Sequence, residues 1–112
     1  MTDPRLKSGM LIQAGVRMCS NRGVPAMVVR RGDPDGGAIY IKINRFENGC
    51  AVLSQVRMEK GRLGWLRATG AEPVTEADAD KYIQRQAKYD PDLWVLEIED
   101  RDGRNPFDDP VV

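Results

Sequence analysis

The chain has 112 residues, 41% of them hydrophobic and 30% charged, with 17 basic and 17 acidic residues and no histidine. This length and composition indicate a single globular domain with one core. Without histidine, Ser-His-Asp and Cys-His catalytic arrangements and histidine metal ligation are excluded. No apolar run approaches the roughly 20 residues that a transmembrane helix needs. The first residues also lack the apolar centre of a signal peptide. We therefore expect a cytoplasmic protein with no membrane partner.

The charge is distributed unevenly along the chain. Residues 1–70 hold twelve Lys and Arg against five Asp and Glu, whereas residues 71–112 hold five against twelve. We expect the two halves to neutralise each other across one small fold, and two opposite charged patches are the alternative. Cys19 and Cys50 are too few for a disulfide framework or a zinc site, so we predict two small apolar thiols, no metal and no cofactor.

After a loose terminus at residues 1–5, the first element is ambiguous between strand and helix. Apolar residues alternate in strand fashion at Met10, Ile12, Ala14, Val16 and Met18. The length of Leu6–Arg22 favours a helix instead, as do Ser8 as a possible N-cap and Asn21-Arg22-Gly23 as a stop signal. We therefore predict a helix over Leu6–Arg22.

Four strands are predicted next, over Ala26–Arg31, Ala38–Arg45, Cys50–Met58 and Arg62–Ala68. The Gly-Asp-Pro-Asp-Gly-Gly segment at residues 32–37 predicts a hairpin between the first two strands, because each of its residues favours a turn. Asn48-Gly49 predicts a type I′ turn between the second and third strands. The four strands should therefore form an antiparallel meander.

The C-terminal third predicts a second helix and a fifth strand. Thr75 is the expected N-cap of a helix that ends at Asp90-Pro91, and Leu93–Glu99 alternates as a strand. That strand could lie parallel to the fourth through a crossover, or antiparallel beside the first. The sequence thus predicts one α+β domain over residues 1–112, ordered α-β-β-β-β-α-β. It has a mostly antiparallel four- to five-stranded sheet and a C-terminal tail at residues 105–112.

Two acidic motifs have a chemical and a structural interpretation. The Asp-x-Asp-Gly units at residues 33–36 and 100–103 could serve calcium, but further oxygen ligands at regular spacing are missing, so we interpret both as turns. A candidate acidic cluster for general acid/base chemistry comprises Glu97, Glu99, Asp100 and Asp102. A solvated or salt-bridged sheet edge explains these acids better, and we predict no catalytic residue.

A candidate binding face follows from strand alternation opposite the isoleucines of residues 39–43. It comprises Arg30, Tyr40, Lys42, Gln55, Arg57, Trp65 and Arg67, with Val28 and Leu53 among them. Basic and aromatic residues on a sheet are typical of single-stranded nucleic-acid binding, although the neutral net charge disfavours that partner. We rank cover by protein first, either a partner, a second protomer or the acidic C-terminal segment. Nucleic acid ranks second, and an enzyme site using Asp or Glu ranks third.

Three segments carry a family resemblance. They are Arg-Leu-Lys at residues 5–7, VVRRGDPDGGA at residues 28–38 and YDPDLWVLEIEDRDGR at residues 89–104. They resemble the uncharacterised small alphaproteobacterial proteins grouped as domain of unknown function 1491. The resemblance covers nearly the whole chain and implies a stand-alone cytoplasmic protein, but it implies no activity, ligand or catalytic residue. We therefore expect a small non-catalytic module that binds another molecule, most simply a protein.

Overall fold

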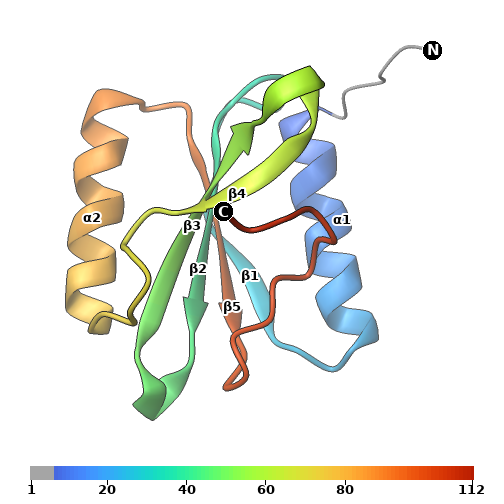
Figure 1. Cartoon of the computed structure of the whole chain (residues 1–112). Coiled ribbons are helices and arrows are strands. Elements are labelled where there is room, and N and C mark those ends of the chain that lie inside the picture. Colours follow the sequence, from blue (N-terminus) through green and yellow to red (C-terminus); the bar gives the residue numbers. More distant parts are fainter. Residues whose placement is uncertain (1–6) are drawn as a thin grey trace.

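The structure is a computed structural model that describes residues 7–112. A five-stranded sheet lies between two helices (Figure 1). The elements in chain order are α1 Ser8–Asn21, β1 Ala26–Arg30, β2 Ile39–Asn44, β3 Cys50–Arg57, β4 Leu63–Arg67, α2 Glu76–Tyr89 and β5 Trp94–Glu99. This order and the mostly antiparallel α+β class are as predicted. The loose terminus predicted for residues 1–5 lies outside the described residues.

The strand order β1-β5-β2-β3-β4 differs from the predicted four-stranded meander. β5 inserts between β1 and β2, antiparallel to β1 and parallel to β2. The prediction of a hairpin at residues 32–37 is therefore wrong, because β1 and β2 are not paired with each other. This segment instead wraps around the start of β5: the Asp33 N–H donates to the Asp92 carbonyl at 2.9 Å, and the Trp94 N–H to that of Ala38 at 2.8 Å.

Strands β2, β3 and β4 do form an antiparallel meander, as predicted. The connection between β2 and β3 is longer than the predicted type I′ turn, because a short 3-10 helix occupies Phe46–Asn48. Positive φ occurs at Phe46 (58°) and Gly49 (91°) rather than at Asn48. The connection between β3 and β4 has positive φ at Lys60 (64°) and Gly61 (74°). The hairpin is confirmed at residues 45–49, but its turn type is wrong.

The helical prediction for the first element is confirmed over Ser8–Asn21, where Ile12 and Cys19 face the sheet. They pack against alternate residues of the two central strands: Ile39, Ile41, Ile43, Trp94, Leu96 and Ile98. The helix stops before Gly23, which has a φ of 71°. Ser8 is not the N-cap, since Lys7 holds that position and the Ser8 hydroxyl donates to the Gly37 carbonyl at 2.6 Å.

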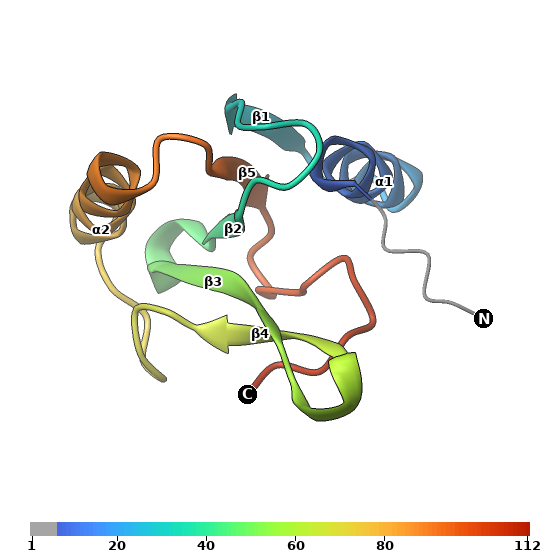
Figure 2. The same cartoon turned by 90° about the horizontal axis from the view of Figure 1, so that it is seen from above.

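The second helix covers the opposite face of the sheet (Figure 2). Thr75 is its N-cap as predicted, and its hydroxyl accepts a hydrogen bond from the Asp78 N–H at 3.1 Å. Ala79 packs against Cys50 and Val52 of β3, with Tyr82 and Ile83 at the margin. Neither helix within residues 7–112 is long and apolar enough to cross a membrane.

The C-terminal segment runs along β4 instead of leaving the domain (Figures 1 and 2). The Trp65 N–H donates to the Pro110 carbonyl at 2.8 Å, and the Val112 N–H donates to the Trp65 carbonyl at 2.7 Å. The ring of Phe107 stacks on Trp65 with centroids 5.4 Å apart. Apolar contact and backbone hydrogen bonds thus hold this segment in place.

Candidate functional site

The predicted binding face does not exist as one surface. Strand pairing sets Leu53 beside Ile41 and Arg67 beside Leu53, so these residues share the isoleucine face, which faces α1. Gln55, Arg57, Trp65 and Val28 lie on that face as well, whereas Arg30, Tyr40 and Lys42 lie on the α2 side. The assignment failed because the face on which a residue of the next strand lies depends on the pairing register. That register can be predicted only if the length of the connecting turn is known.

The aromatic members of that set are not exposed for base stacking. Trp65 is 0% exposed beneath Phe107. Tyr40 is half-buried and meets Tyr82 of α2 edge-on, with ring centroids 6.3 Å apart. The C-terminal segment therefore covers Trp65, as expected, but the covering side chain is the aromatic ring of Phe107 and not an acidic residue. Within the described chain no ion pair joins Asp108 or Asp109 to an arginine.

Lys42 is the centre of a charged cluster between the sheet and α2. Its side chain is only 4% exposed, and its Nζ lies 2.8 Å from Glu76 Oε2, 2.7 Å from Asp80 Oδ1 and 3.5 Å from Glu97 Oε1. Burial lowers the pKa of Lys42, but the hydrogen bonds to Asp80 and Glu76 and the charge of Glu97 outweigh it and raise that pKa above its ordinary value. A protonated lysine that is bound by carboxylates of α2 stabilises the packing of this helix on the sheet. It does not act as a nucleophile.

The candidate acidic cluster is dispersed. Glu97 belongs to the Lys42 cluster, and Glu99 pairs with Asn44 at the end of the parallel ladder. Asp100 is buried and accepts hydrogen bonds from the Arg104 side chain and from the backbone N–H groups of Asp102 and Arg104. Asp33 closes its own turn by accepting from the Gly36 N–H at 2.9 Å. Both Asp-x-Asp-Gly units are therefore turns, as predicted. No metal-binding cluster of His, Cys, Asp and Glu occurs among residues 7–112.

Both cysteines are free and buried. Burial raises the pKa of the Cys19 thiol, with a smaller lowering by Arg22, and burial likewise raises that of Cys50, partly opposed by Lys42. A buried, protonated thiol is a weak nucleophile. These residues serve the core, in accord with the sequence interpretation.

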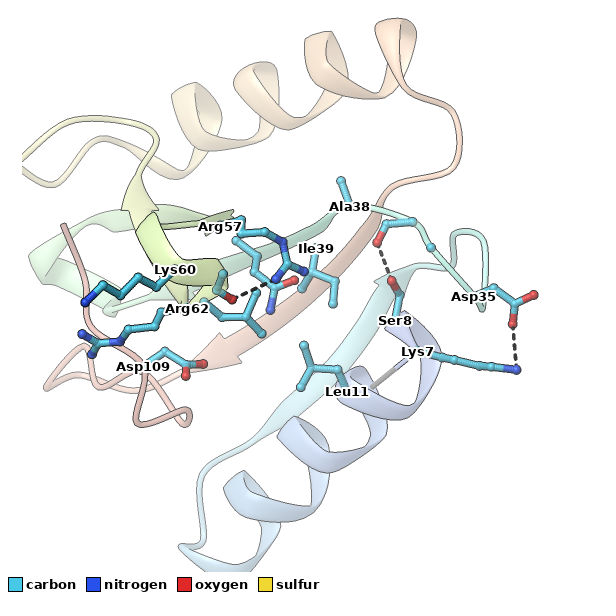
Figure 3. Close-up of a pocket in the computed structure, with 15 residues that line it drawn as sticks. Lys7, Ser8, Leu11, Asp35, Ala38, Ile39, Arg57, Lys60, Arg62 and Asp109 are labelled. Carbon is cyan, nitrogen blue, oxygen red and sulfur yellow. Dashed lines mark hydrogen bonds and ion pairs between the residues drawn. The ribbon is translucent and has the colours of Figure 1, made fainter. Parts of the chain in front are cut away.

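A pocket of about 900 Å³ lies between the start of α1 and the β3–β4 hairpin (Figure 3). Leu11, Ile39 and Leu63 provide its apolar lining. Four cationic side chains surround it against two acids, Asp35 and Asp109; the cations are Lys7, Arg57, Lys60 and Arg62. In Figure 3 Lys60 and Arg62 extend from the hairpin on the side away from Lys7. The pocket therefore has an apolar floor and a basic rim.

Several of these groups already have partners. Lys7 Nζ lies 3.5 Å from Asp35 Oδ1, and Arg57 donates through Nη1 to the Gly61 carbonyl at 2.9 Å, which holds the hairpin in shape. Within residues 7–112 neither Lys60 nor Arg62 forms an ion pair. The Nε2 atom of Gln55, another lining residue, is buried and meets no acceptor in the described chain. The charges of Lys60 and Arg62 and the Gln55 amide N–H are thus the groups of this pocket that have no partner in the described chain.

Sequence reasoning named Gln55 and Arg57 but missed Lys7, Lys60 and Arg62. The concentration of Arg57, Lys60 and Arg62 in one predicted hairpin was the available signal. Their approach to the start of α1 depends on tertiary structure, so alternation within single strands could not reveal it.

The protein is therefore an α+β domain with a parallel strand pair at the centre of a mostly antiparallel sheet and a basic pocket at one end of α1. It belongs to the family described as "Protein of unknown function (DUF1491)", whose model matches residues 6–108.

Solved structures support this assignment. The crystal structure of a DUF1491 family protein from Caulobacter crescentus CB15 is 35% identical, with a TM-score of 0.86 over 96% of this chain and 100% of that one. An NMR structure of a DUF1491 family protein from the same organism is 35% identical, with a TM-score of 0.82 over 96% of each chain. The solution structure of protein Atu0922 from A. tumefaciens shares the fold, with a TM-score of 0.71 at 24% identity over 85% of this chain and 86% of that one. No curated protein matches the sequence.

Proposed function

We propose that this protein is a small cytoplasmic, non-catalytic binding module that holds a phosphate-bearing ligand in the pocket between α1 and the β3–β4 hairpin. One observation carries the proposal: four cations from two separate segments surround a single concavity that contains only two acids. Cations that line one hollow in excess of acids favour an anion.

The ligand class follows from the chemistry of the rim. The guanidinium groups of Arg57 and Arg62 offer forked donors that suit phosphate oxygens, and Lys60 adds a mobile point charge. The buried Gln55 amide N–H would gain its missing acceptor from such an oxygen. The apolar floor formed by Leu11, Ile39 and Leu63 suits a non-phosphate portion of the same ligand.

A binding role fits the pocket better than catalysis. The Ser8 hydroxyl donates to the Gly37 carbonyl, and Asp35 pairs with Lys7, so both groups are engaged. The thiols of Cys19 and Cys50 are buried elsewhere in the core. The cytoplasmic location rests on these two free thiols, since reduced cysteines are typical of that compartment.

The test is a calorimetric and NMR titration of the protein with pyrophosphate. A double variant, Lys60→Asn with Arg62→Gln, removes two rim charges; asparagine tolerates the positive φ at position 60. We expect the double variant to bind about tenfold more weakly or worse, the loss of one or two charge-assisted contacts. The charge-matched control, Arg17→Gln with Arg85→Gln, alters exposed helix positions away from the pocket and should change affinity by less than about twofold because of screening.

Equal losses in the two double variants would show that attraction is nonspecific and would overturn the proposal, as would no binding of pyrophosphate to the unaltered protein. A short oligodeoxythymidylate serves as a second probe. Salt-sensitive binding of the oligonucleotide without binding of pyrophosphate would favour single-stranded nucleic acid, the alternative function, over a compact phosphate ligand.

A further inference from the structure

Strand β1 forms one edge of the sheet and exposes apolar side chains. It pairs with β5 alone, and Figure 2 shows no helix beyond its free edge. Three consecutive residues are exposed to solvent: Met27 by 58%, Val28 by 38% and Val29 by 48%. An apolar free edge can pair with a further strand, because its outward N–H and C=O groups have no partner. Natural proteins usually protect such an edge with charged residues, with proline or with a covering helix or loop.

The free backbone groups of β1 can be located from its pairing with β5. The Pro25 carbonyl accepts a hydrogen bond from the Glu99 N–H, so Pro25 and Glu99 are a hydrogen-bonded pair of the antiparallel ladder. By alternation Met27 also bonds toward β5, whereas the N–H and C=O groups of Ala26 and Val28 point to the free edge. Among the described residues no backbone group outside β5 bonds to Ala26 or Val28.

Arginines stand at both ends of this apolar strand. Arg22 precedes it, Arg30 is its last residue and Arg31 follows it. Arg30 donates through Nη2 to the Pro91 carbonyl, but its buried Nε meets no acceptor in the described chain, and the guanidinium of Arg31 lies 5.7 Å from the centroid of the Trp94 ring. On the neighbouring strand, Glu97 is the ladder partner of Met27, and its carboxylate is already paired with Lys42. The edge therefore has an apolar middle and basic ends.

This charge pattern disfavours a second copy of the chain. An antiparallel pairing centred on Val28 would set Arg30 opposite Ala26 of the copy, which brings the arginines that follow one strand toward the Arg22 that precedes the other. Like charges would then approach each other at both ends of the pairing, which destabilises it. A strand with an apolar centre and acidic ends has the complementary pattern.

We propose that β1 is a docking edge for an extended, acid-flanked peptide segment of another protein, which adds a strand to the sheet. Backbone bonds to Ala26 and Val28 would supply register, and Arg22, Arg30 and Arg31 would select the acidic flanks. This site is independent of the phosphate pocket, because β1 and the β3–β4 hairpin lie at opposite ends of the strand order.

The test is an NMR titration of the labelled protein with a short peptide of alternating valine and threonine that has two glutamates at each end. We expect shifts at the amides of Ala26 and Val28, and about tenfold weaker binding of the same peptide with lysine ends. Val28→Pro removes an outward N–H while leaving the bonds to β5, and should abolish the shifts. Arg30→Glu with Arg31→Glu should reverse the preference, so that the lysine-ended peptide binds more tightly.

Equal affinity for both peptides, or an unchanged preference in the charge-reversed variant, would overturn the proposal. The charge-reversed variant also keeps the test decisive if Val28→Pro does not fold. Sedimentation of the unaltered protein provides a further arm: a dimer that Val28→Pro dissociates would show that a second copy occupies the edge instead.

Discussion

Gly37 illustrates how a single residue permits the wrapped connection between β1 and β2. A Cβ atom built there would overlap the carbonyl oxygen of Asp92 and would lie 3.0 Å from the Trp94 ring, so no side chain fits between this segment and the start of β5. Adjacent Gly36 is different, since its Cβ would meet only Asp33 Oδ2 at 3.7 Å. The two glycines look equivalent in the sequence. They differ in the structure only because the start of β5 lies close to Gly37 and not to Gly36.

We predict that Gly37→Ala lowers the free energy of unfolding by about 1–3 kcal/mol, the usual cost of overpacking. Gly36→Ala is the matched control, because both changes restrict the unfolded chain equally; it should change stability by no more than about 1 kcal/mol in the stabilising direction. Urea denaturation measures both values. Similar stabilities for the two variants would contradict the close contact with Asp92.

Asp100 provides a second prediction at the scale of one residue, and it concerns pH. Hydrogen bonds from the Arg104 side chain lower the pKa of this carboxyl, against a smaller opposing effect of burial and with help from the backbone N–H groups of Arg104 and Asp102. A lowered folded-state pKa contributes stability above the unfolded value of about 3.9, and that contribution is lost as the pH falls through the folded-state value.

Asp100→Asn should therefore destabilise the protein by about 1.5–3 kcal/mol at pH 7, the range for hydrogen bonds to a charged group. The difference from the unaltered protein should shrink below about pH 4. Denaturant unfolding at both pH values provides the measurement. Asp102→Asn, at an exposed position, is the control and should be nearly neutral; an undiminished difference at low pH would refute the assignment.

Among the secondary-structure elements, the C-terminal segment replaces a helix as the cover for one end of the sheet. Phe107 stacks on Trp65 and also reaches α1, where a Cβ on Gly15 would lie 2.8 Å from its Cζ atom. The segment predicted from the sequence as an acidic cover is thus an apolar plug joined to β4 by backbone hydrogen bonds.

Phe107→Ala should lower the free energy of unfolding by about 3–5 kcal/mol, as is typical for removing a buried aromatic ring. It should also alter tryptophan fluorescence, because Trp65 becomes exposed to solvent. Tyr89→Ala removes an aromatic side chain that is 80% exposed, so its effect on stability should be small. Chemical denaturation followed by fluorescence gives both results. A Phe107→Ala protein as stable as the control would show that the segment is not part of the core.

The elements that could be predicted are those whose signals are local. The helix N-cap at Thr75, the stop at Gly23 and the alternation of Trp94, Leu96 and Ile98 each depend on a few neighbouring residues, and each is found in the structure. The partner of β1 could not be predicted in the same way. Residues 32–37 favour any tight change of direction, and nothing within them reveals that β5, some 60 residues later, occupies the place beside β1.

For the molecule as a whole, the opposed charges of the two halves meet only in part. Lys42 from the basic half pairs with Glu76, Asp80 and Glu97 from the acidic half, which agrees with the predicted neutralisation. Around the pocket between α1 and the β3–β4 hairpin, the only acids among the lining residues are Asp35 and Asp109, against four cations of the basic half. A zero net charge therefore coexists with a basic hollow, and for this reason composition alone is a poor guide to whether this protein binds anions.

The position of β5 leads to a prediction about cooperativity across the whole fold. It is the strand beside both β1 and β2, and Leu96 and Ile98 are fully buried in it. Detaching β5 would leave β1 with no partner and open the core under α1, so its amides should exchange with solvent only when the entire domain unfolds. Hydrogen exchange followed by NMR should find the amides of Leu96 and Ile98 among the slowest, with free energies equal to that of global unfolding. The outward N–H of Val28 should exchange rapidly. If the β2–β4 meander stayed protected while β5 exchanged through a smaller opening, the domain would be two cooperative units, and the parallel pair of β2 and β5 would not be its centre.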